Sequence, residues 1–111
     1  MSKKNEGKPM MSLMSANTIA YVTKVREYGI KKYGMADDWK TTERKLHYDA
    51  ALRHIYAEFE GEINDSESGL PHLAHAICNL MFLIEADIEN GELDKLIGNP
   101  IPHTDNRKSS K

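Results

Sequence analysis

Five carboxylates lie between residues 58 and 67 without one Lys or Arg among them: Glu58, Glu60, Glu62, Asp65 and Glu67. Carboxylates gathered without cationic partners repel one another unless a metal ion or another outside cation joins them. Carboxylate oxygens are the ligands that Mg²⁺ prefers, with waters and substrate phosphates completing its coordination. The alternative is that the segment is a solvated, acidic helix end.

Three of these carboxylates, Glu58, Glu62 and Asp65, have the spacing i, i+4 and i+7. If the helix continues through Gly61, they share one face, where they could hold a divalent ion. A spare carboxylate there could orient a water molecule for attack. Gly61 marks either a kink or the end of this helix.

Two histidines and an amide, His72, His75 and Asn79, follow the next turn at helical spacing. Neutral imidazoles at i and i+3 could bind a transition metal such as zinc, iron, nickel or manganese. Two ligands do not complete a site and the HExxH motif is absent, so we expect the pair to line a polar cavity. Asn79 is a lone amide in an apolar run, so it either ties one helix to another or faces a ligand.

Cationic and aromatic residues precede the acidic segment. Arg53 and Asp49 form an ion pair in the simplest interpretation, whereas an Arg53 that faces a cleft could bind phosphate. Lys32 and Trp39 offer charge and an aromatic face to a nucleotide, although Trp39 is equally consistent with a core residue. No glycine-rich phosphate loop and no Ser or Cys nucleophile motif is present, so metal and helix-borne side chains must hold any phosphate.

Three helices are expected to position these groups. The first begins near Ser15 or Asn17 and ends at Gly34, the second runs from 41–43 to about 60, and the third from 70–71 to about 90. Residues 35–40 are expected to be a loop, and 92–97 could add a short fourth helix. In the second helix, apolar residues at three- to four-residue spacing are expected to face the core: Tyr48, Ala51, Leu52, Ile55, Phe59 and Ile63.

The third helix is apolar nearly all round between Ala76 and Ile84, which is typical of a bundle centre or a subunit interface. We therefore expect a homodimer or homotetramer. No segment shows β-alternation. The predicted fold class is all-α, a small bundle completed by oligomerisation, with one domain at 15–97 between flexible tails at 1–14 and 98–111.

The composition excludes several classes of protein. A chain of 111 residues with 40% hydrophobic and 29% charged residues is typical of one globular domain, and its net charge of −2 gives no general drive toward nucleic acid. The single cysteine, Cys78, cannot form an intrachain disulfide and is expected to be a buried thiol. No signal peptide is visible, and the longest apolar run, 80–84, is far short of the ~20 residues of a membrane-spanning helix. These features indicate a cytoplasmic protein that has no membrane contact.

Three segments together resemble the phage-associated dATP/dGTP diphosphohydrolase N-terminal domain family: KYGMADDW (32–39), YDAALRHIYAEFEGE (48–62) and DSESGLPHLAHAICNLMFL (65–83). The family is similar to the MazG-like all-α NTP pyrophosphatases, and the resemblance spans roughly residues 19–90. It implies a helical dimer or tetramer, in the host cytoplasm if phage-encoded. It also implies that a (deoxy)purine nucleoside triphosphate is cleaved to monophosphate and pyrophosphate with Mg²⁺.

The resemblance also implies roles for individual residues. Glu62 would be the base, and the metal ligands would be Glu58, Glu62, Asp65 and His75. His72-x-x-His75 stands where the MazG-like pattern has acidic ligands, which could favour Mn²⁺ or another transition metal. The substrate would be contacted by Lys32, Trp39, Arg53, His54, His72 and Asn79. The alternative function is a non-catalytic helical oligomer that binds a nucleotide or a protein partner.

Overall fold

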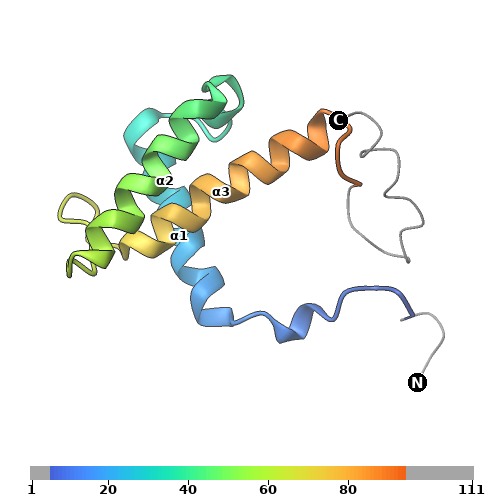
Figure 1. Ribbon diagram of the computed structural model, residues 1–111, viewed down its shortest axis with the longest axis horizontal. Helices are drawn as coiled ribbons and strands as arrows, with labels where there is room; N and C mark the ends of the chain where they lie inside the picture. Colours follow the sequence, from blue (N-terminus) through green and yellow to red (C-terminus); the bar gives the residue numbers. More distant parts are fainter. Residues whose placement is uncertain (1–5, 95–111) are drawn as a thin grey trace.

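The computed structural model describes residues 6–94, and within them every regular element is helical. Three α-helices pack with α3 in contact with both others, most extensively with α2 (Figure 1). The described residues contain no β-strand, only an isolated bridge between Asn64 and Pro71. The elements are η2 (Met11–Leu13), α1 (Ala16–Tyr33), η3 (Asp38–Thr41), α2 (Arg44–Phe59) and α3 (His72–Glu89). The all-α prediction is confirmed.

Helix α1 begins and ends where its capping residues predict. The Ser15 hydroxyl accepts a hydrogen bond from the Thr18 N–H at 3.2 Å, which caps the first turn. At the other end Gly34 has φ of 85° and donates its N–H to the Ile30 carbonyl at 2.7 Å. Glycine adopts this left-handed conformation without steric cost, so the helix ends there.

Helix α2 ends at Phe59 because Gly61 takes φ of 112° and turns the chain away. The N–H of Glu62 bonds the Ala57 carbonyl at 3.0 Å and that of Gly61 bonds the Glu58 carbonyl at 2.9 Å, the arrangement of a Schellman motif. Glu62 and Asp65 therefore lie in the loop that follows. Of the two alternatives for Gly61, the helix end is the one observed, so Glu58, Glu62 and Asp65 do not share one helical face.

The buried face of α2 overlaps only in part with the apolar stripe predicted for it. His47 and Ala51 are its buried residues, whereas Phe59 is 82% exposed, Leu52 45% and the following Ile63 65%. Helices α2 and α3 make the most extensive contact in the bundle, and small side chains are buried on both, Ala51 on α2 and Ala76 on α3. The predicted core stripe is therefore confirmed at Ala51 but wrong for Leu52, Phe59 and Ile63, which are exposed in the single chain.

The segment predicted as a loop over 35–40 contains the 3-10 turn η3. Trp39 within it stacks on Phe82 of α3, with ring centroids 5.0 Å apart and planes at 5°. Helix α2 begins after Glu43 without a side-chain cap, and the nearby Thr42 donates its hydroxyl to the Asp38 carbonyl at 3.2 Å instead. The turn thereby fixes Trp39 beside α3.

Helix α3 spans His72–Glu89, close to the predicted range, with Pro71 one position before its first residue. Its buried residues include Ala74 and Cys78, which pack with Val22 and Val25 of α1. Residues 92–94 are not helical, and the rest of the predicted fourth helix lies outside the described residues. So do residues 1–5 and the whole predicted tail at 98–111, and the domain boundaries remain predictions. No helix in the part of the chain that the structure describes is long and apolar enough to cross a membrane.

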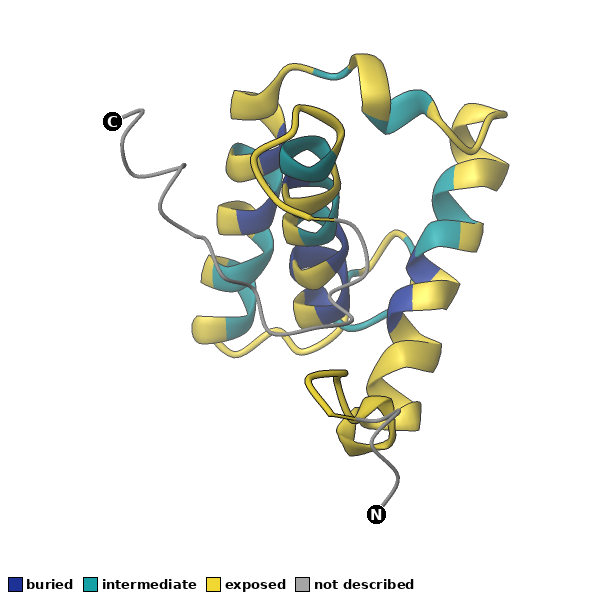
Figure 2. Ribbon diagram, turned by 90° about the vertical axis from the view of Figure 1, so that its right-hand side faces the viewer, coloured by how far each residue is buried: buried dark blue, intermediate teal, exposed yellow. Residues whose placement is uncertain are grey.

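Several large apolar residues are exposed, and exposed positions recur along all three helices, where the ribbon is yellow (Figure 2). On α3 they recur at helical spacing, so that they form one stripe. Its members are Leu73, Ile77, Leu80 and Ile84. Helix α3 is thus buried on one side and offers apolar surface on the other.

The Cys78 thiol is buried, as predicted, and burial raises its pKa to about 11. At pH 8 its thiolate fraction is then about 100-fold smaller than that of a thiol with the ordinary pKa of 9.0. We expect Cys78 to react with a disulfide reagent such as DTNB about 100-fold more slowly in the native protein than in guanidinium. The native rate should keep rising above pH 9. Equal rates for the native and unfolded chains would contradict the buried position.

Candidate functional site

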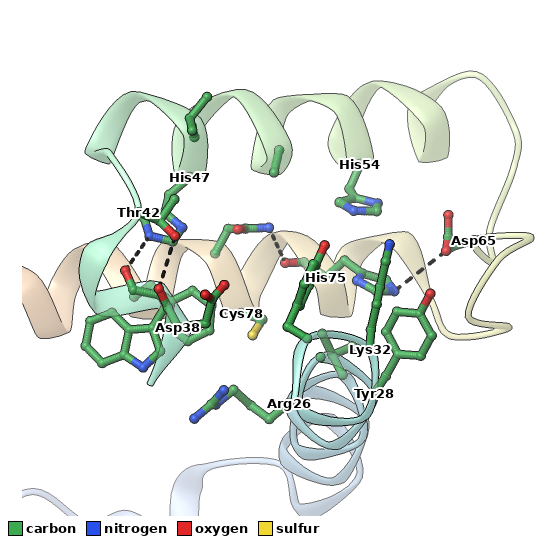
Figure 3. Close-up of a pocket in the computed structure, with 18 of the residues that line it drawn as sticks. Arg26, Tyr28, Lys32, Asp38, Thr42, His47, His54, Asp65, His75 and Cys78 are labelled. Atoms are coloured by element: carbon green, nitrogen blue, oxygen red, sulfur yellow. Dashed lines mark hydrogen bonds and ion pairs between the residues drawn. The ribbon is translucent and has the colours of Figure 1, made fainter. Parts of the chain in front are cut away.

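A cavity of about 520 Å³ lies between the three helices and η3, with α2 above it, α1 below it and α3 behind it (Figure 3). One end is aromatic, because Trp39 and Phe82 line it. The other end is polar and includes His54, Asp65 and His75. The volume is in the range of small-molecule binding sites.

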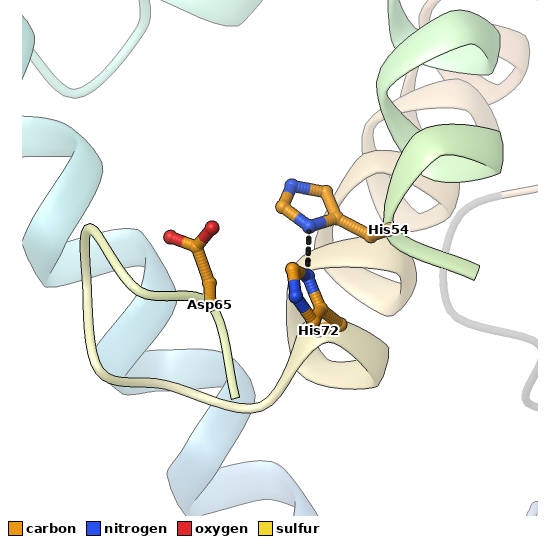
Figure 4. Close-up of side chains that lie close together, drawn as sticks. All are labelled: His54, Asp65 and His72. Carbon is orange, nitrogen blue, oxygen red and sulfur yellow. Dashed lines mark hydrogen bonds between the residues drawn. The ribbon is translucent and has the colours of Figure 1, made fainter. Parts of the chain in front are cut away.

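The polar end continues into a cluster made by three different parts of the chain. His54 comes from α2, Asp65 from the loop after it, and His72 is the first residue of α3 (Figure 4). One ligand-type atom from each of these side chains lies within 4.8 Å of the others. This is the group with metal-ligand spacing in the part of the chain that the structure describes.

The hydrogen-bond partners in this cluster indicate which tautomers two neutral imidazoles would take. His72 Nε2 lies 2.7 Å from Glu62 Oε1, and His72 Nδ1 lies 2.8 Å from His54 Nδ1. An ionised carboxylate only accepts, so His72 Nε2 carries a proton and donates it. A neutral His72 then has its lone pair at Nδ1, and the N–H of His54 Nδ1 donates to it. Glu62 thus sets the tautomers of both imidazoles.

The loop between α2 and α3 holds Asp65 in place. Its ends are joined by backbone bonds from His72 N–H to the Ile63 carbonyl and from Asp65 N–H to the Leu70 carbonyl, both 2.8 Å. The Ser68 N–H bonds Asp65 Oδ2 at 3.0 Å. Burial acts to raise the pKa of Asp65, but hydrogen bonds from the Ser68 backbone and hydroxyl outweigh it, and the pKa is lowered. The carboxylate is therefore charged and fixed in direction.

His75 lies beside the cluster and is hydrogen-bonded elsewhere. Its Nε2 is 2.7 Å from the Ser68 hydroxyl and 4.0 Å from Asp65 Oδ2, and its ring stacks on His54 at 4.4 Å. Burial lowers the pKa of His75, and burial together with the neighbouring imidazoles lowers the pKa of His54 to about 4. Both rings are consequently neutral at pH 7.

On the α1 side of the cavity, Lys32 and Tyr28 both contact Glu67. The Lys32 ammonium lies 2.8 Å from Glu67 Oε2, and the Tyr28 hydroxyl donates to the same oxygen. The hydrogen bond to Glu67 raises the pKa of Lys32, and the contacts with Lys32 and Tyr28 lower the pKa of Glu67. The sequence analysis did not assign Tyr28 to the site, although it precedes Lys32 by one helical turn.

The family model described as dATP/dGTP diphosphohydrolase, N-terminal, matches residues 1–96. The chain belongs to this family. A relative named dATP/dGTP diphosphohydrolase, from Salmonella phage PMBT28, is 35% identical over 81 residues. The match covers 73% of this chain but only 28% of the relative, so the chain corresponds to about a quarter of that protein. No solved structure matches the chain.

In this dATP/dGTP diphosphohydrolase family member, most residues named from the sequence meet at the cavity. Glu62 and His72 do not line the cavity: Glu62 is hydrogen-bonded to His72, which is hydrogen-bonded to His54 in the cavity wall. Glu58 neither lines the cavity nor belongs to the cluster with metal-ligand spacing. The predicted site residues that line the cavity are Lys32, Trp39, Arg53, His54, Asp65, His75 and Asn79.

Two of the local pairings expected from the sequence differ in the structure of this family member. Asp49 pairs with Lys45 at 3.2 Å, so the predicted Asp49–Arg53 ion pair is wrong. Arg53 lines the cavity and forms no ion pair with the described residues. Asn79 donates to the His75 carbonyl of its own helix at 3.0 Å, so its amide does not tie α3 to another helix and instead lines the cavity.

Proposed function

We propose that the chain is the metal-dependent hydrolytic domain of a nucleoside triphosphate pyrophosphohydrolase, acting on a (deoxy)purine nucleotide to release monophosphate and pyrophosphate. Its family membership and the name of its phage relative support this proposal. The observation that carries it is the two-ended cavity, with Trp39 and Phe82 at one end and His54, Asp65 and His75 at the other. A base and a phosphate chain need these two environments.

The cavity offers each part of a nucleotide a suitable group. The aromatic end provides apolar surface for a purine ring. Lys32 and Arg53 supply positive charge, and the amide of Asn79 supplies a donor and an acceptor for the sugar or the base. Arg53 is the stronger phosphate candidate because Lys32 is already paired with Glu67.

A triphosphate carries about four negative charges, so a pocket that contains Asp65 and Glu67 needs a divalent ion to accept it. The metal-spaced cluster does not fit a Mg²⁺ ion held by protein oxygens, because two of its three donors are imidazole nitrogens. The donor set is instead typical of Mn²⁺ and other transition metals. The requirement for a metal remains a prediction.

Hydrolysis at the α-phosphorus needs a water molecule held in line and a group that accepts its proton. We propose Glu62 for this role. Its Oε1 accepts the bond from His72, its Oε2 makes no hydrogen bond to the described residues, and its side chain is 57% exposed, so water can reach it.

Incubation of the purified chain with each dNTP and Mg²⁺ or Mn²⁺ tests the proposal. We expect equal amounts of pyrophosphate and deoxynucleoside monophosphate, with the greatest activity on a purine substrate. Release of single phosphates or of tripolyphosphate would assign cleavage to another bond and reject the proposal. Metal-dependent binding of the nucleotide without any product would indicate a non-catalytic binding protein.

The exposed stripe on α3 supports assembly into a homodimer or homotetramer, because four large apolar side chains on one face are costly to leave in water. We expect light scattering to give two or four times the chain mass of 12.6 kDa. Leu80→Asp should lower that mass, whereas Lys24→Asp, on the exposed surface of α1, should not. A wild-type mass of one chain would contradict the assembly.

A further inference from the structure

The cluster of His54, His72 and Asp65 has a composition that the predicted Mg²⁺ site does not explain. Two imidazoles and one carboxylate converge from α2, α3 and the loop between them. Figure 4 shows the two imidazole rings and the Asp65 carboxylate close together, with the rings joined by a hydrogen bond.

The spacing of the two ring nitrogens is that of neighbouring ligands on a metal ion. Two donors bound at about 2.1 Å and at right angles are about 3 Å apart, and the two Nδ1 atoms are 2.8 Å apart. Two donors on opposite sides of the ion are about 4.2 Å apart. The three ligand atoms of the cluster all lie within 4.8 Å of one another, so shifts of under about 1 Å would bring them to ligand spacing. Side-chain rotations of Asp65 and His54 supply such shifts without moving the helices.

The hydrogen bond between His72 and Glu62 prepares His72 as a ligand. Because Nε2 donates to the Glu62 carboxylate at 2.7 Å, the lone pair is at Nδ1 and faces His54. A metal-bound histidine commonly donates its other N–H to a carboxylate in this way, which fixes the ring and makes it a better ligand. His72 is also buried, so its ring has little freedom to turn away.

We propose that His54 Nδ1, His72 Nδ1 and an oxygen of Asp65 form a binding site for one divalent transition metal ion, with Mn²⁺, Fe²⁺ and Co²⁺ as the fitting class. The metal takes the place of the proton that lies between the two Nδ1 atoms. That proton belongs to His54 and moves to its Nε2. Since His54 and Asp65 line the cavity, the remaining coordination positions face it and are available to water or phosphate oxygens. This metal site deepens the proposed function by naming the class of metal. Only a role of the metal in turnover rests on that function.

Titration of the nucleotide-free protein with Co²⁺ and Mn²⁺ tests the site, by calorimetry and by the visible absorption of bound Co²⁺. We expect one ion per chain and an affinity at least about 100-fold above that for Mg²⁺. His54→Ala and Asp65→Asn should each weaken Co²⁺ binding by about 100-fold and change its spectrum, since each removes or replaces a ligand. The Asp65 variant keeps the shape of the side chain, so it serves if His54→Ala does not fold.

His47→Gln is the matched control, because His47 is on the same helix and the same cavity wall but bonds the Trp39 carbonyl at 3.2 Å. Its Co²⁺ affinity should equal that of the wild type. Absence of Co²⁺ binding, or equal affinity in the wild type and both ligand variants, would overturn the site. Pyrophosphate release with Mg²⁺ by a protein that binds no Co²⁺ would support the proposed function and reject the metal site. Co²⁺ binding without any turnover would support the metal site and reject the proposed function.

Discussion

Glu62→Gln is expected to lower kcat for pyrophosphate release by about 1000-fold while changing KM little. Glutamine keeps an oxygen that accepts the N–H of His72, so the local geometry is retained. It cannot take a proton from an attacking water, and general bases contribute roughly 10²–10⁴-fold to rate. The measurement is steady-state kinetics with the preferred dNTP, after circular dichroism has shown that the variant is folded.

Two further measurements separate a base from a residue that only positions His72. Co²⁺ affinity should stay within about 3-fold of the wild type in Glu62→Gln, because the bond to His72 persists. Glu60→Gln is the matched control, an exposed carboxylate two residues earlier, and should retain full activity. Loss of Co²⁺ affinity in parallel with activity would show that Glu62 acts through the metal ligands, which contradicts the proposed base.

Arg53→Ala is expected to lower kcat/KM for the triphosphate by about 10- to 100-fold, mostly through KM. A charge-assisted hydrogen bond to phosphate contributes about 1.5–3 kcal/mol, and this side chain lines the cavity without an ion pair to the described residues. Arg53→Lys should recover part of the loss, since it restores the charge but not the two-pronged geometry. Thermal unfolding should change little in either variant.

Arg44→Ala is the control for Arg53→Ala. Arg44 also belongs to α2, but it pairs with Asp87 of α3 at 3.0 Å and does not line the cavity. Its loss removes a surface ion pair that contributes little to stability and should leave KM unchanged. An equal rise in KM for both variants would indicate a general electrostatic effect and would contradict a specific phosphate contact by Arg53.

The sequence predicted the helices well because local chemistry determines where they begin and end. The Ser15 hydroxyl caps α1, Gly34 ends it in a left-handed conformation, and the apolar run of α3 forms the predicted helix. Short motifs around Trp39, Arg53 and His75 were specific enough to identify the family, which the match over residues 1–96 confirmed.

The sequence did not show which side of α2 is buried. A periodic apolar pattern gives a face, but it does not say whether that face meets the core of the same chain or another surface. Leu52 and Phe59 are exposed in the single chain, while His47 and Ala51 are buried against α3 and η3. Only the packing of the helices decided this, because small residues allow a closer approach than large ones.

Spacing along the chain determined which residue types were available for chemistry: the carboxylates around Glu62, the two histidines of α3, and Arg53. Their partners were decided by tertiary structure. Gly61 ends α2, so Glu62 and Asp65 leave the helix of Glu58, and the loop carries them to His72 and His54. The physical reason is that helical spacing predicts neighbours only within one unbroken helix. Contacts between α2, the loop and α3 depend on where the chain turns and on which backbone bonds close the loop.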